Sequence, residues 1–445
     1  MAGRRRHTRQ QLNALPIVTG VLVERLSHEG RGVARVDGKT VFIDGALPGE
    51  TVSFRYTSRH GQFDEATATE IANDHAERVV PGCAHAARCG GCSLLHFAPD
   101  AQVTHKQAML LELLLHQAKL IPERVLPPVT APRWGYRRRA RLSARVVAKR
   151  AELLLGFREK SAHFVADITR CETLIPAVGQ HLVAIRTMLN TLSCAAQIPQ
   201  VEVAAGDTEV ALLIRHMTPL SAEDLVQLRA FAHTSGLRIY SQPGNISTLL
   251  RLDGPEEPLT YTVAGLTLNF QPGDFVQVNG PINAQIVPLA LELLALTAQD
   301  TVLDLFSGLG NFTLPIATHA GQVMGIEGDA GLVARARDNA TRLGLANARF
   351  EVADLFTEAG IKGIPRAPWT RLLLDPPRSG AAEVLAALDL RKVERVCYVS
   401  CNPVTLARDA ATLANVHGYT LTAAGVIDMF PQTTHVESIA LFERR

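Results

Sequence analysis

The part of the chain from residue 261 to residue 445 alternates between short apolar segments and segments of helical periodicity. Such alternation favours a doubly wound α/β fold built on a parallel sheet. The last two strand segments are joined only by the loop MFPQTTH, so we expect the final strand to run antiparallel. The seven predicted strands of this Rossmann-like sheet are TVLDLF, QVMGIE, ARFEVA, RLLLD, ERVCYVS, YTLTAAGVID and ESIALFE.

Glycines and acidic residues follow these strands at the edge where such sheets bind ligands. The first strand runs into SGLGNF, where Gly308 and Gly310 allow a sharp turn, but the third glycine of a dinucleotide fingerprint is missing. Glu327, Asp354 and Asp375 end the second, third and fourth strands. An acid after the second strand can bind ribose hydroxyls. We therefore predict an adenosyl cofactor, and S-adenosylmethionine fits best because the sheet lacks a phosphate loop.

A cysteine, Cys401, ends the fifth strand in YVSCNP at the same edge. Pro403 suits the first turn of a following helix, and a thiol at a helix N-terminus is expected to have a lowered pKa. Methylation of nitrogen needs no thiol, whereas C5 of a pyrimidine becomes nucleophilic once a thiolate adds to C6. A general base must then remove the C5 proton. Glu437 opens the last strand at this edge, and His435 is the rival base.

Several segments together resemble the RNA uracil-5 methyltransferase family: QPGDFVQVN, DLFSGLGNFTLP, DPPRSG, YVSCNP and HVES, in this order. The resemblance covers nearly the whole chain. It implies that Cys401 is the nucleophile, and it favours Glu437 over His435 as the proton acceptor. It leaves open whether Asp375 serves the cofactor, the target base or both. The cofactor contacts that it implies are Gln277, Phe306, Asn311, Glu327, Asp354 and Asp375.

Three cysteines form a C-x5-C-x2-C pattern in PGCAHAARCGGCSLLHF, where two glycines let the backbone wrap closely around an ion or cluster. Cys171, in ITRCETLIP, is the best fourth ligand, and the spacing fits zinc and an iron–sulfur cluster equally well. His85 and His96 are available as substitutes, while Cys194 and Cys397 stand alone and are expected to be buried. The pattern resembles the 4Fe–4S site of the family's ribosomal-RNA branch, which implies as ligands Cys83, Cys89, Cys92 and Cys171.

The chain reads as a multidomain protein of α/β and β parts. Short strands over 14–72, with an Asp37-Gly38 hairpin signal, predict a small OB-like barrel, and this segment resembles a TRAM domain. Helices are predicted over 101–119 and 222–235. The expected parts are a basic tail at 1–13, the TRAM barrel at 14–72, a central α+β domain with the iron–sulfur site at 73–260, and the methyltransferase domain at 261–445.

Basic residues cluster although the net charge is only +2. Trp134 and Tyr136 are interleaved with the second cluster, which contains no acid, and this combination is typical of single-stranded nucleic-acid binding. The clusters are Arg4, Arg5, Arg6 and Arg9, and then Arg133, Arg137, Arg138, Arg139, Arg141, Arg145, Lys149 and Arg150. The chain shows no apolar run of membrane-spanning length and no secretory signal, so we expect a cytoplasmic location without membrane contact.

The family resemblance implies transfer of a methyl group from S-adenosylmethionine to C5 of a uridine in 23S ribosomal RNA. A transfer-RNA uridine or another ribosomal site is the alternative within the family, and no obligate protein partner is evident. An N-methyltransferase is the next alternative, because DPP at 375–377 begins its motif, but Arg378 replaces the stacking aromatic and Cys401 stays unexplained. An iron–sulfur radical methylase would carry a CxxxCxxC loop, whereas the cysteines of this chain follow a C-x5-C-x2-C spacing. A non-catalytic RNA-binding assembly factor would have a broken cofactor loop or lack the thiol.

Overall fold

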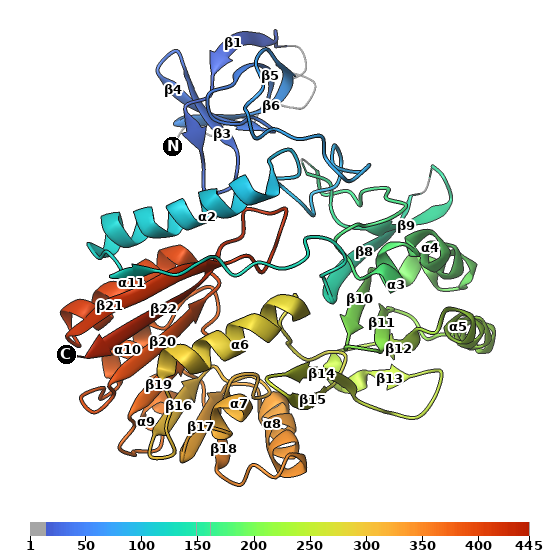
Figure 1. The fold of residues 1–445 in the computed structure, drawn as a ribbon. Helices are drawn as coiled ribbons and strands as arrows, with labels where there is room; N and C mark the ends of the chain where they lie inside the picture. Colours follow the sequence, from blue (N-terminus) through green and yellow to red (C-terminus); the bar gives the residue numbers. More distant parts are fainter. Residues whose placement is uncertain (1–14, 148, 161, 445) are drawn as a thin grey trace, which may run out of the picture. The chain divides into compact units, whose positions relative to one another are not determined.

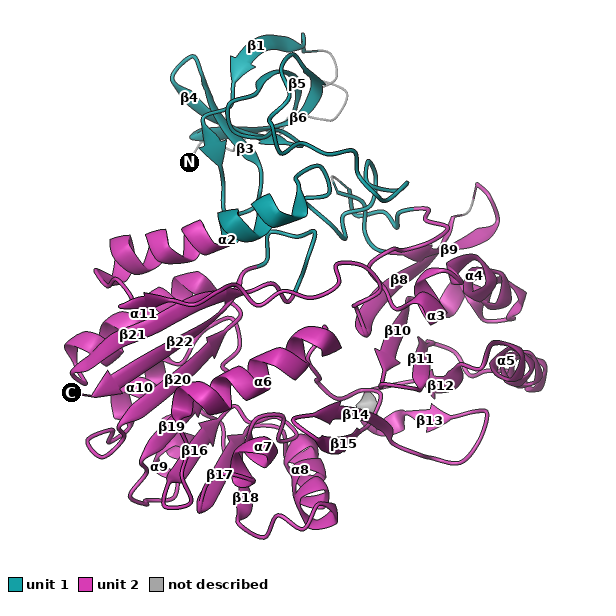
Figure 2. Ribbon diagram, in the orientation of Figure 1, with its two compact units in different colours: residues 1–106, 157–166, 430–435 teal, residues 107–156, 167–429, 436–445 magenta. Residues whose placement is uncertain are grey.

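Residues 15–147, 149–160 and 162–444 are described by the computed structural model (Figure 1). The predicted basic tail, with Arg4, Arg5, Arg6 and Arg9, lies outside them. The chain divides into two units (Figure 2), of which the first comprises residues 1–106, 157–166 and 430–435 and the second residues 107–156, 167–429 and 436–445. The domain boundaries at 14, 73 and 261 stay predictions.

The first unit is built around a six-stranded sheet in the order β1-β5-β6-β4-β3-β2. The sheet curls, because β1 and β3 contact each other from opposite sides of this order, and it encloses apolar residues such as Val41, Ile43 and Phe54. Asp37 and Gly38 both have positive φ and join two strands, as the hairpin signal predicts. The strands are β1 (Val18–Leu22), β2 (Arg25–Leu26), β3 (Gly32–Val36), β4 (Lys39–Asp44), β5 (Thr51–Arg59) and β6 (Phe63–Ile71).

The predicted helix over 101–119 is confirmed as α2 (Pro99–Leu113) with a final π-helical turn, η1 (Leu114–Ala118). In the second unit a six-stranded sheet has the order β13-β12-β11-β10-β8-β9. The helix predicted over 222–235 is α5 (Ala222–Ser235), which begins at a capping box formed by Ser221 and Asp224. The other elements are β8 (Arg139–Val147), β9 (Glu152–Gly156), α3 (Pro176–Gly179), α4 (Leu182–Thr191), η2 (Ala195–Gln197), β10 (Gln200–Ala205), β11 (Val210–Arg215), β12 (Arg238–Gln242), η3 (Ile246–Thr248), β13 (Leu250–Arg251) and the hairpin β14 (Leu259–Val263) with β15 (Leu266–Phe270).

The second unit also contains the large sheet predicted from the C-terminal pattern, with the order β18-β17-β16-β19-β20-β22-β21-β7. All seven predicted strands form, and the last one, β22, is antiparallel to both neighbours. The strands are β16 (Thr301–Leu305), β17 (Gln322–Glu327), β18 (Ala348–Val352), β19 (Arg371–Leu374), β20 (Arg395–Ser400), β21 (Tyr419–Ile427) and β22 (Glu437–Arg444). The helices that accompany them are α6 (Gly280–Leu294), α7 (Thr313–Ala317), α8 (Ala330–Arg342), α9 (Glu358–Lys362), α10 (Ala382–Ala387) and α11 (Pro403–Asn415).

This sheet has eight strands, so the prediction of seven was wrong by one. The additional strand, β7 (Arg124–Val125), pairs in parallel with β21 and covers that edge. A two-residue strand beside prolines carries no periodic signal, and its partner is distant in the sequence. The central strands are apolar on both faces, as expected for parallel strands covered by helices. Within the described ranges, no helix combines the length and the apolar character that crossing a bilayer requires.

Candidate active site

The antiparallel pairing of β20 with β22 brings the predicted nucleophile and base together. Ser400, the last residue of β20, pairs with Ser438 on β22. Cys401 directly follows Ser400, and Glu437 directly precedes Ser438. The two side chains therefore start from facing positions at the same end of the sheet. Glu437 is only 7% exposed, whereas Cys401 is partly buried. The two positions assigned from the sequence therefore meet at the carboxyl edge of the parallel strands.

The environment of the Cys401 thiol differs from the sequence prediction. Pro403 does occupy the first turn of α11, and Asn402 caps the helix. The pKa of Cys401 is nevertheless raised to about 12, first by burial and then by the carboxylates of Glu437 and Asp375. Burial outweighs the helix N-terminus because desolvation disfavours the thiolate directly. The prediction of a lowered pKa is therefore wrong for the protein without substrate.

One positive charge opposes this shift. The positive charge of the Arg378 guanidinium lowers the pKa of the Cys401 thiol, because a cation favours the thiolate. Sequence reasoning noted Arg378 only as the residue that replaces an aromatic side chain. The signal that could have identified it is its position three residues after the acid that ends the fourth strand.

The glycine-rich loop after β16 turns towards the end of β17. Phe306, Gly308 and Gly310 all have positive φ, and a Cβ at Gly310 would lie 2.9 Å from Leu314. The backbone N–H of Gly308 donates to Glu327 Oε2 at 3.0 Å. The predicted cofactor loop and the predicted ribose-binding acid are thus adjacent in the structure.

Two further predicted contacts are joined by a hydrogen bond. Gln277 Nε2 donates to Asp375 Oδ2 at 3.2 Å. Burial raises the pKa of Asp375 to about 7. Asp304, the residue before the last of the neighbouring strand β16, is fully buried, and its pKa is raised to about 8, first by burial. Acidic groups therefore crowd an edge with little solvent, which is typical of ligand-binding and catalytic sites.

Asn311 is held by residues that the sequence did not indicate. It exchanges hydrogen bonds with Asn283 at 2.8 and 2.9 Å, and its Oδ1 also accepts from the Tyr261 hydroxyl at 3.0 Å. Both partners come from elements that precede the sheet, α6 and β14, so no spacing within the motif points to them.

Asp354, the least specific of the predicted cofactor contacts, is exposed after β18 and accepts from the backbone N–H of Phe356 at 3.0 Å. The ring of Phe356 packs against the ring of Phe306, with centroids 5.7 Å apart. This contact ties the loop after β18 to the loop after β16. His435, the rival base, belongs to the first unit, where its ring lies edge-on to Phe430.

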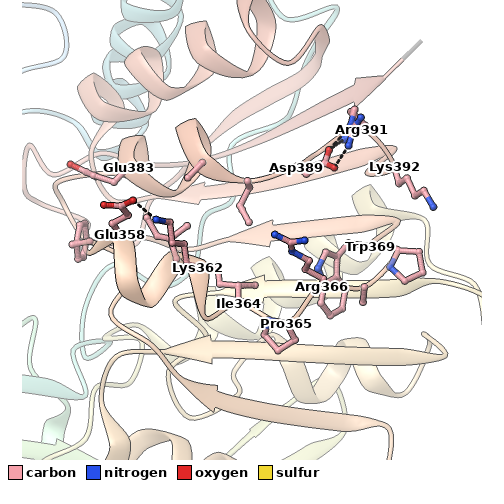
Figure 3. Close-up of a pocket in the computed structure, with 16 residues that line it drawn as sticks. Glu358, Lys362, Ile364, Pro365, Arg366, Trp369, Glu383, Asp389, Arg391 and Lys392 are labelled. Carbon is pink, nitrogen blue, oxygen red and sulfur yellow. Dashed lines mark hydrogen bonds and ion pairs between the residues drawn. The ribbon is translucent and has the colours of Figure 1, made fainter.

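A surface cleft of about 1510 Å³ lies elsewhere in the second unit (Figure 3). It is lined by α9, α10 and the segments that lead into β19 and β20, and it includes none of the predicted site residues. Two of its charged pairs satisfy each other, Lys362 with Glu358 and Arg391 with Asp389. Because none of the predicted catalytic or cofactor-binding residues lines this cleft, we do not place the chemistry there.

The predicted metal-binding cysteines are distributed over both units, Cys83, Cys89 and Cys92 in the first and Cys171 in the second. In the part of the chain that the structure describes, no three His, Cys, Asp or Glu side chains lie close enough together to hold a metal ion. The backbone N–H of Gly91 donates to Cys89 Sγ at 3.4 Å. Cys194 and Cys397 are buried, as predicted.

The arginine-rich segment forms one face of β8. Burial alternates along this strand, so that Ala140, Leu142 and Ala144 point into the protein while Arg141 and Arg145 are exposed. Trp134, shortly before the strand, is 40% exposed. The Arg139 guanidinium lies 5.8 Å from the ring of Phe275, which is itself largely exposed. Cations and aromatic rings thus share one surface.

Known families match both ends of the chain. The family described as tRNA (Uracil-5-)-methyltransferase matches residues 226–445, and the TRAM domain matches residues 18–57. Among solved structures, the Pyrococcus abyssi tRNA (uracil-54, C5)-methyltransferase in complex with S-adenosyl-L-homocysteine has a TM-score of 0.71 and covers 96% of this chain and 100% of that chain. Its sequence is 22% identical, so the likeness shows a shared fold.

Curated relatives match nearly the whole length. The 23S rRNA (uracil(1939)-C(5))-methyltransferase RlmD of Alkalilimnicola ehrlichii is 49% identical, over 95% of this chain and 96% of the relative. The RlmD of Stenotrophomonas maltophilia is 46% identical, over 98% of this chain and 99% of the relative. The chain belongs to the RlmD family of RNA uracil-C5 methyltransferases.

Proposed function

We propose that this protein transfers a methyl group from S-adenosylmethionine to C5 of a uridine in 23S ribosomal RNA. The observation that carries the proposal is the antiparallel pairing of β20 with β22, which puts Cys401 and Glu437 opposite each other, with the Asp375 carboxylate near the thiol. Nitrogen methylation has no use for this pair, whereas C5 methylation needs both a thiol and a base. The names of the full-length relatives support ribosomal RNA as the substrate. The location that we propose with this substrate is the cytoplasm.

Cys401 loses its thiol proton to solvent and, as the thiolate, starts the reaction by adding its sulfur to C6 of the uracil ring. The S–C6 bond forms, and the electrons of the C5–C6 double bond move onto the ring as an enolate, so that C5 becomes nucleophilic. S-adenosylmethionine, when bound, supplies an electrophilic methyl group. After C5 is methylated, Glu437 removes the C5 proton, the double bond re-forms and Cys401 leaves as a thiolate.

The loop after β16 fits an adenosyl cofactor. Asp304 Oδ1, near the end of β16, and Ser307 Oγ, in the loop, are buried without a hydrogen-bond partner in the described protein. Gly308 and Gly310 follow them in left-handed conformations. Buried polar atoms of this kind are normally satisfied, so they indicate a missing partner. In this proposal Glu327 accepts from the ribose hydroxyls, Asp354 meets the adenine, and Asp375 serves the cofactor, the target base or both. The residues proposed to hold the cofactor are Gln277, Phe306, Asn311, Glu327, Asp354 and Asp375.

Replacing Glu327 with glutamine tests the cofactor site. Glu327→Gln keeps the size of the side chain but removes the charge that strengthens hydrogen bonds from ribose hydroxyls. We expect the Kd for S-adenosylmethionine, measured by calorimetry, to rise about tenfold, which corresponds to about 1.4 kcal/mol. Glu358→Gln, which changes an exposed carboxylate on α9, is the control and leaves the Kd unchanged. An unchanged Kd in Glu327→Gln would remove Glu327 from the site.

In this proposal the TRAM barrel and the exposed arginines of β8 each bind RNA. Arginine forks bind phosphates, and exposed rings such as that of Trp134 stack on unpaired bases. Because Cys401 and Glu437 are largely enclosed, a uridine within a helix cannot reach them. We infer that the target uridine leaves its stack and enters the site as a flipped base from a loop or single strand.

RNA containing 5-fluorouridine distinguishes the proposed reaction and its substrate. Fluorine at C5 cannot be removed as a proton, so the enzyme traps itself on its substrate as a covalent adduct. We expect an adduct with 23S ribosomal RNA on a denaturing gel in the presence of S-adenosylmethionine. An adduct with transfer RNA alone would keep the chemistry and change the substrate. No adduct with either RNA, although cofactor binds, would overturn C5 methylation.

We further propose that Cys83, Cys89 and Cys92, with Cys171 as the fourth ligand, hold a 4Fe–4S cluster. The thiolate donor set suits iron–sulfur chemistry. The hydrogen bond from the backbone of Gly91 to Cys89 Sγ is of the kind that stabilises a thiolate ligand. A Cβ at Gly90 would lie 2.9 Å from the carbonyl oxygen of Arg158, so the backbone there approaches its neighbour as closely as glycine allows. The role proposed for the cluster is structural.

Metal analysis of protein purified without oxygen tests the cluster. We expect about four iron and about four sulfide per chain, with broad visible absorption. Cys89→Ser should lose most of the iron because serine is a poor ligand for the cluster. Cys194→Ala, which changes a buried cysteine outside the pattern, should keep it. Zinc in place of iron would support a metal site of thiolates but contradict the 4Fe–4S cluster. Full iron content in Cys89→Ser would show that Cys89 is not a ligand.

A further inference from the structure

The turn that follows β19 is held on the first part of α11 by side chains from that helix and its cap. The carbonyl oxygen of Arg378 accepts hydrogen bonds from Asn402 Nδ2 at 2.9 Å and from Thr405 Oγ1 at 3.4 Å. The next carbonyl oxygen, that of Ser379, accepts from Arg408 Nη2 at 2.9 Å. The turn is therefore tied to the helix that begins beside the nucleophile.

The carboxylate of Asp409 completes this attachment from inside the protein. It is fully buried, and its Oδ2 accepts from the backbone N–H of Ala381 at 2.7 Å and from the hydroxyl of Tyr398 at 2.7 Å. Its Oδ1 accepts from Arg408 at 2.8 Å, so the buried charge has a counterion. A buried carboxylate needs hydrogen-bond partners, and the bond from Ala381 together with the ion pair to Arg408 fixes its orientation relative to the turn. Asp409 thus joins the turn, strand β20 and helix α11.

Gly380 shows how closely the turn approaches α11. Its φ is +81°, and an added Cβ would lie 2.6 Å from Asp409 Oδ2 and 3.0 Å from Thr405 Cβ. No side chain fits between the turn and the helix, so the two pack as one rigid piece.

We propose that Arg408 and Asp409 are positioning residues for the catalytic thiol, because they hold in place the turn of Arg378, whose carbonyl oxygen is bonded to Asn402, the residue that follows Cys401. Neither side chain takes part in the proposed reaction itself. The inference rests on the proposed function of Cys401 as the nucleophile, and it deepens that function by assigning the support of the site.

This support matters because the charges around the thiol oppose one another. Glu437 and Asp375 disfavour the thiolate, and Arg378 favours it. A charge effect falls off with distance, so a turn that moves away from α11 weakens the attraction by Arg378 while Glu437 stays fixed on β22. Formation of the thiolate then becomes harder although the cofactor loop after β16 is untouched.

The rate at which iodoacetamide alkylates Cys401 tests this role without RNA. Below the pKa of a thiol, this rate follows its thiolate fraction, so a pKa higher by one unit slows it tenfold. We expect Asp409→Asn and Arg408→Ala to slow alkylation of Cys401 about tenfold at pH 8. Mass spectrometry of the peptide that contains Cys401 measures this rate. In methylation assays kcat should fall about as much, with the Kd for S-adenosylmethionine unchanged. Arg408→Lys, which can still donate to Ser379, should restore most of the rate.

Tyr398→Phe is the matched control, because it removes a partner of the same carboxylate without touching the turn. It should lower the Tm but leave alkylation within twofold of the unsubstituted protein. Equal slowing in Tyr398→Phe would show a general loss of stability and overturn the inference. A folded Arg408→Ala variant whose Cys401 is alkylated at the full rate would also overturn the inference. Because Arg408 is partly exposed, its replacement is compatible with folding. If Asp409→Asn does not fold, the comparison of Arg408→Ala with Arg408→Lys still tests the positioning role. Since alkylation needs no RNA, a wrong substrate assignment would leave this result unchanged.

Discussion

Cys401→Ala is expected to abolish methylation of the RNA while leaving cofactor and RNA binding intact. Without the thiol, C5 of uracil is not activated, and the other groups of the site cannot replace the missing S–C6 bond. Loss of a covalent nucleophile typically lowers kcat by a factor of about 10⁴ or more. Transfer of a labelled methyl group from S-adenosylmethionine to 23S ribosomal RNA measures this effect, with filter binding and calorimetry to follow the two ligands.

The matched control for this variant is Cys397→Ala, which removes a thiol from the strand that leads to Cys401. Cys397 is fully buried in the middle of β20, so its loss affects packing but not the chemistry. That variant should still methylate RNA and still form an adduct with 5-fluorouridine RNA, whereas Cys401→Ala forms none. Methylation by Cys401→Ala at more than about a hundredth of the normal rate would contradict nucleophilic catalysis by this cysteine.

The meeting of Cys401 and Glu437 could be predicted because it depends only on strand polarity. A parallel strand ends, and an antiparallel strand begins, at the same edge of a sheet, and the short loop before β22 made its direction readable. The pairing of Ser400 with Ser438 confirms that argument. The ends of β17 and β19 could be predicted in the same way, because apolar runs followed by an acid mark them clearly.

The state of the thiol could not be predicted, because burial depends on packing between distant segments. The sequence indicates a helix N-terminus next to Cys401, but it does not indicate the burial of the thiol that raises its pKa to about 12. The bond between Asp409 and Ala381 spans 28 positions, and no motif relates them. The pairing of Arg124 with Ala423 is more distant still. Such contacts decide how a site is supported, and they appear only in the folded chain.

Glu437→Gln is expected to allow methyl transfer but to stall the enzyme as a covalent adduct with its RNA. The amide cannot accept the C5 proton, so the S–C6 bond cannot be released. Loss of a general base typically slows a reaction by about 10²–10⁴-fold. A labelled methyl group should therefore appear in a protein–RNA band on a denaturing gel. Glu443→Gln, at the other end of β22 and paired with Arg395, is the control and should turn over normally.

The charge of Glu437 adds a second expectation that separates a base from a merely structural residue. The Glu437 carboxylate raises the pKa of the Cys401 thiol, so its removal should lower that pKa and speed alkylation of the cysteine. Attack on C6 should then be at least as fast as normal while release fails, a combination that loss of folding cannot produce. Normal turnover in Glu437→Gln, or slow turnover without an adduct, would place the base elsewhere, and His435→Gln would be the variant to compare.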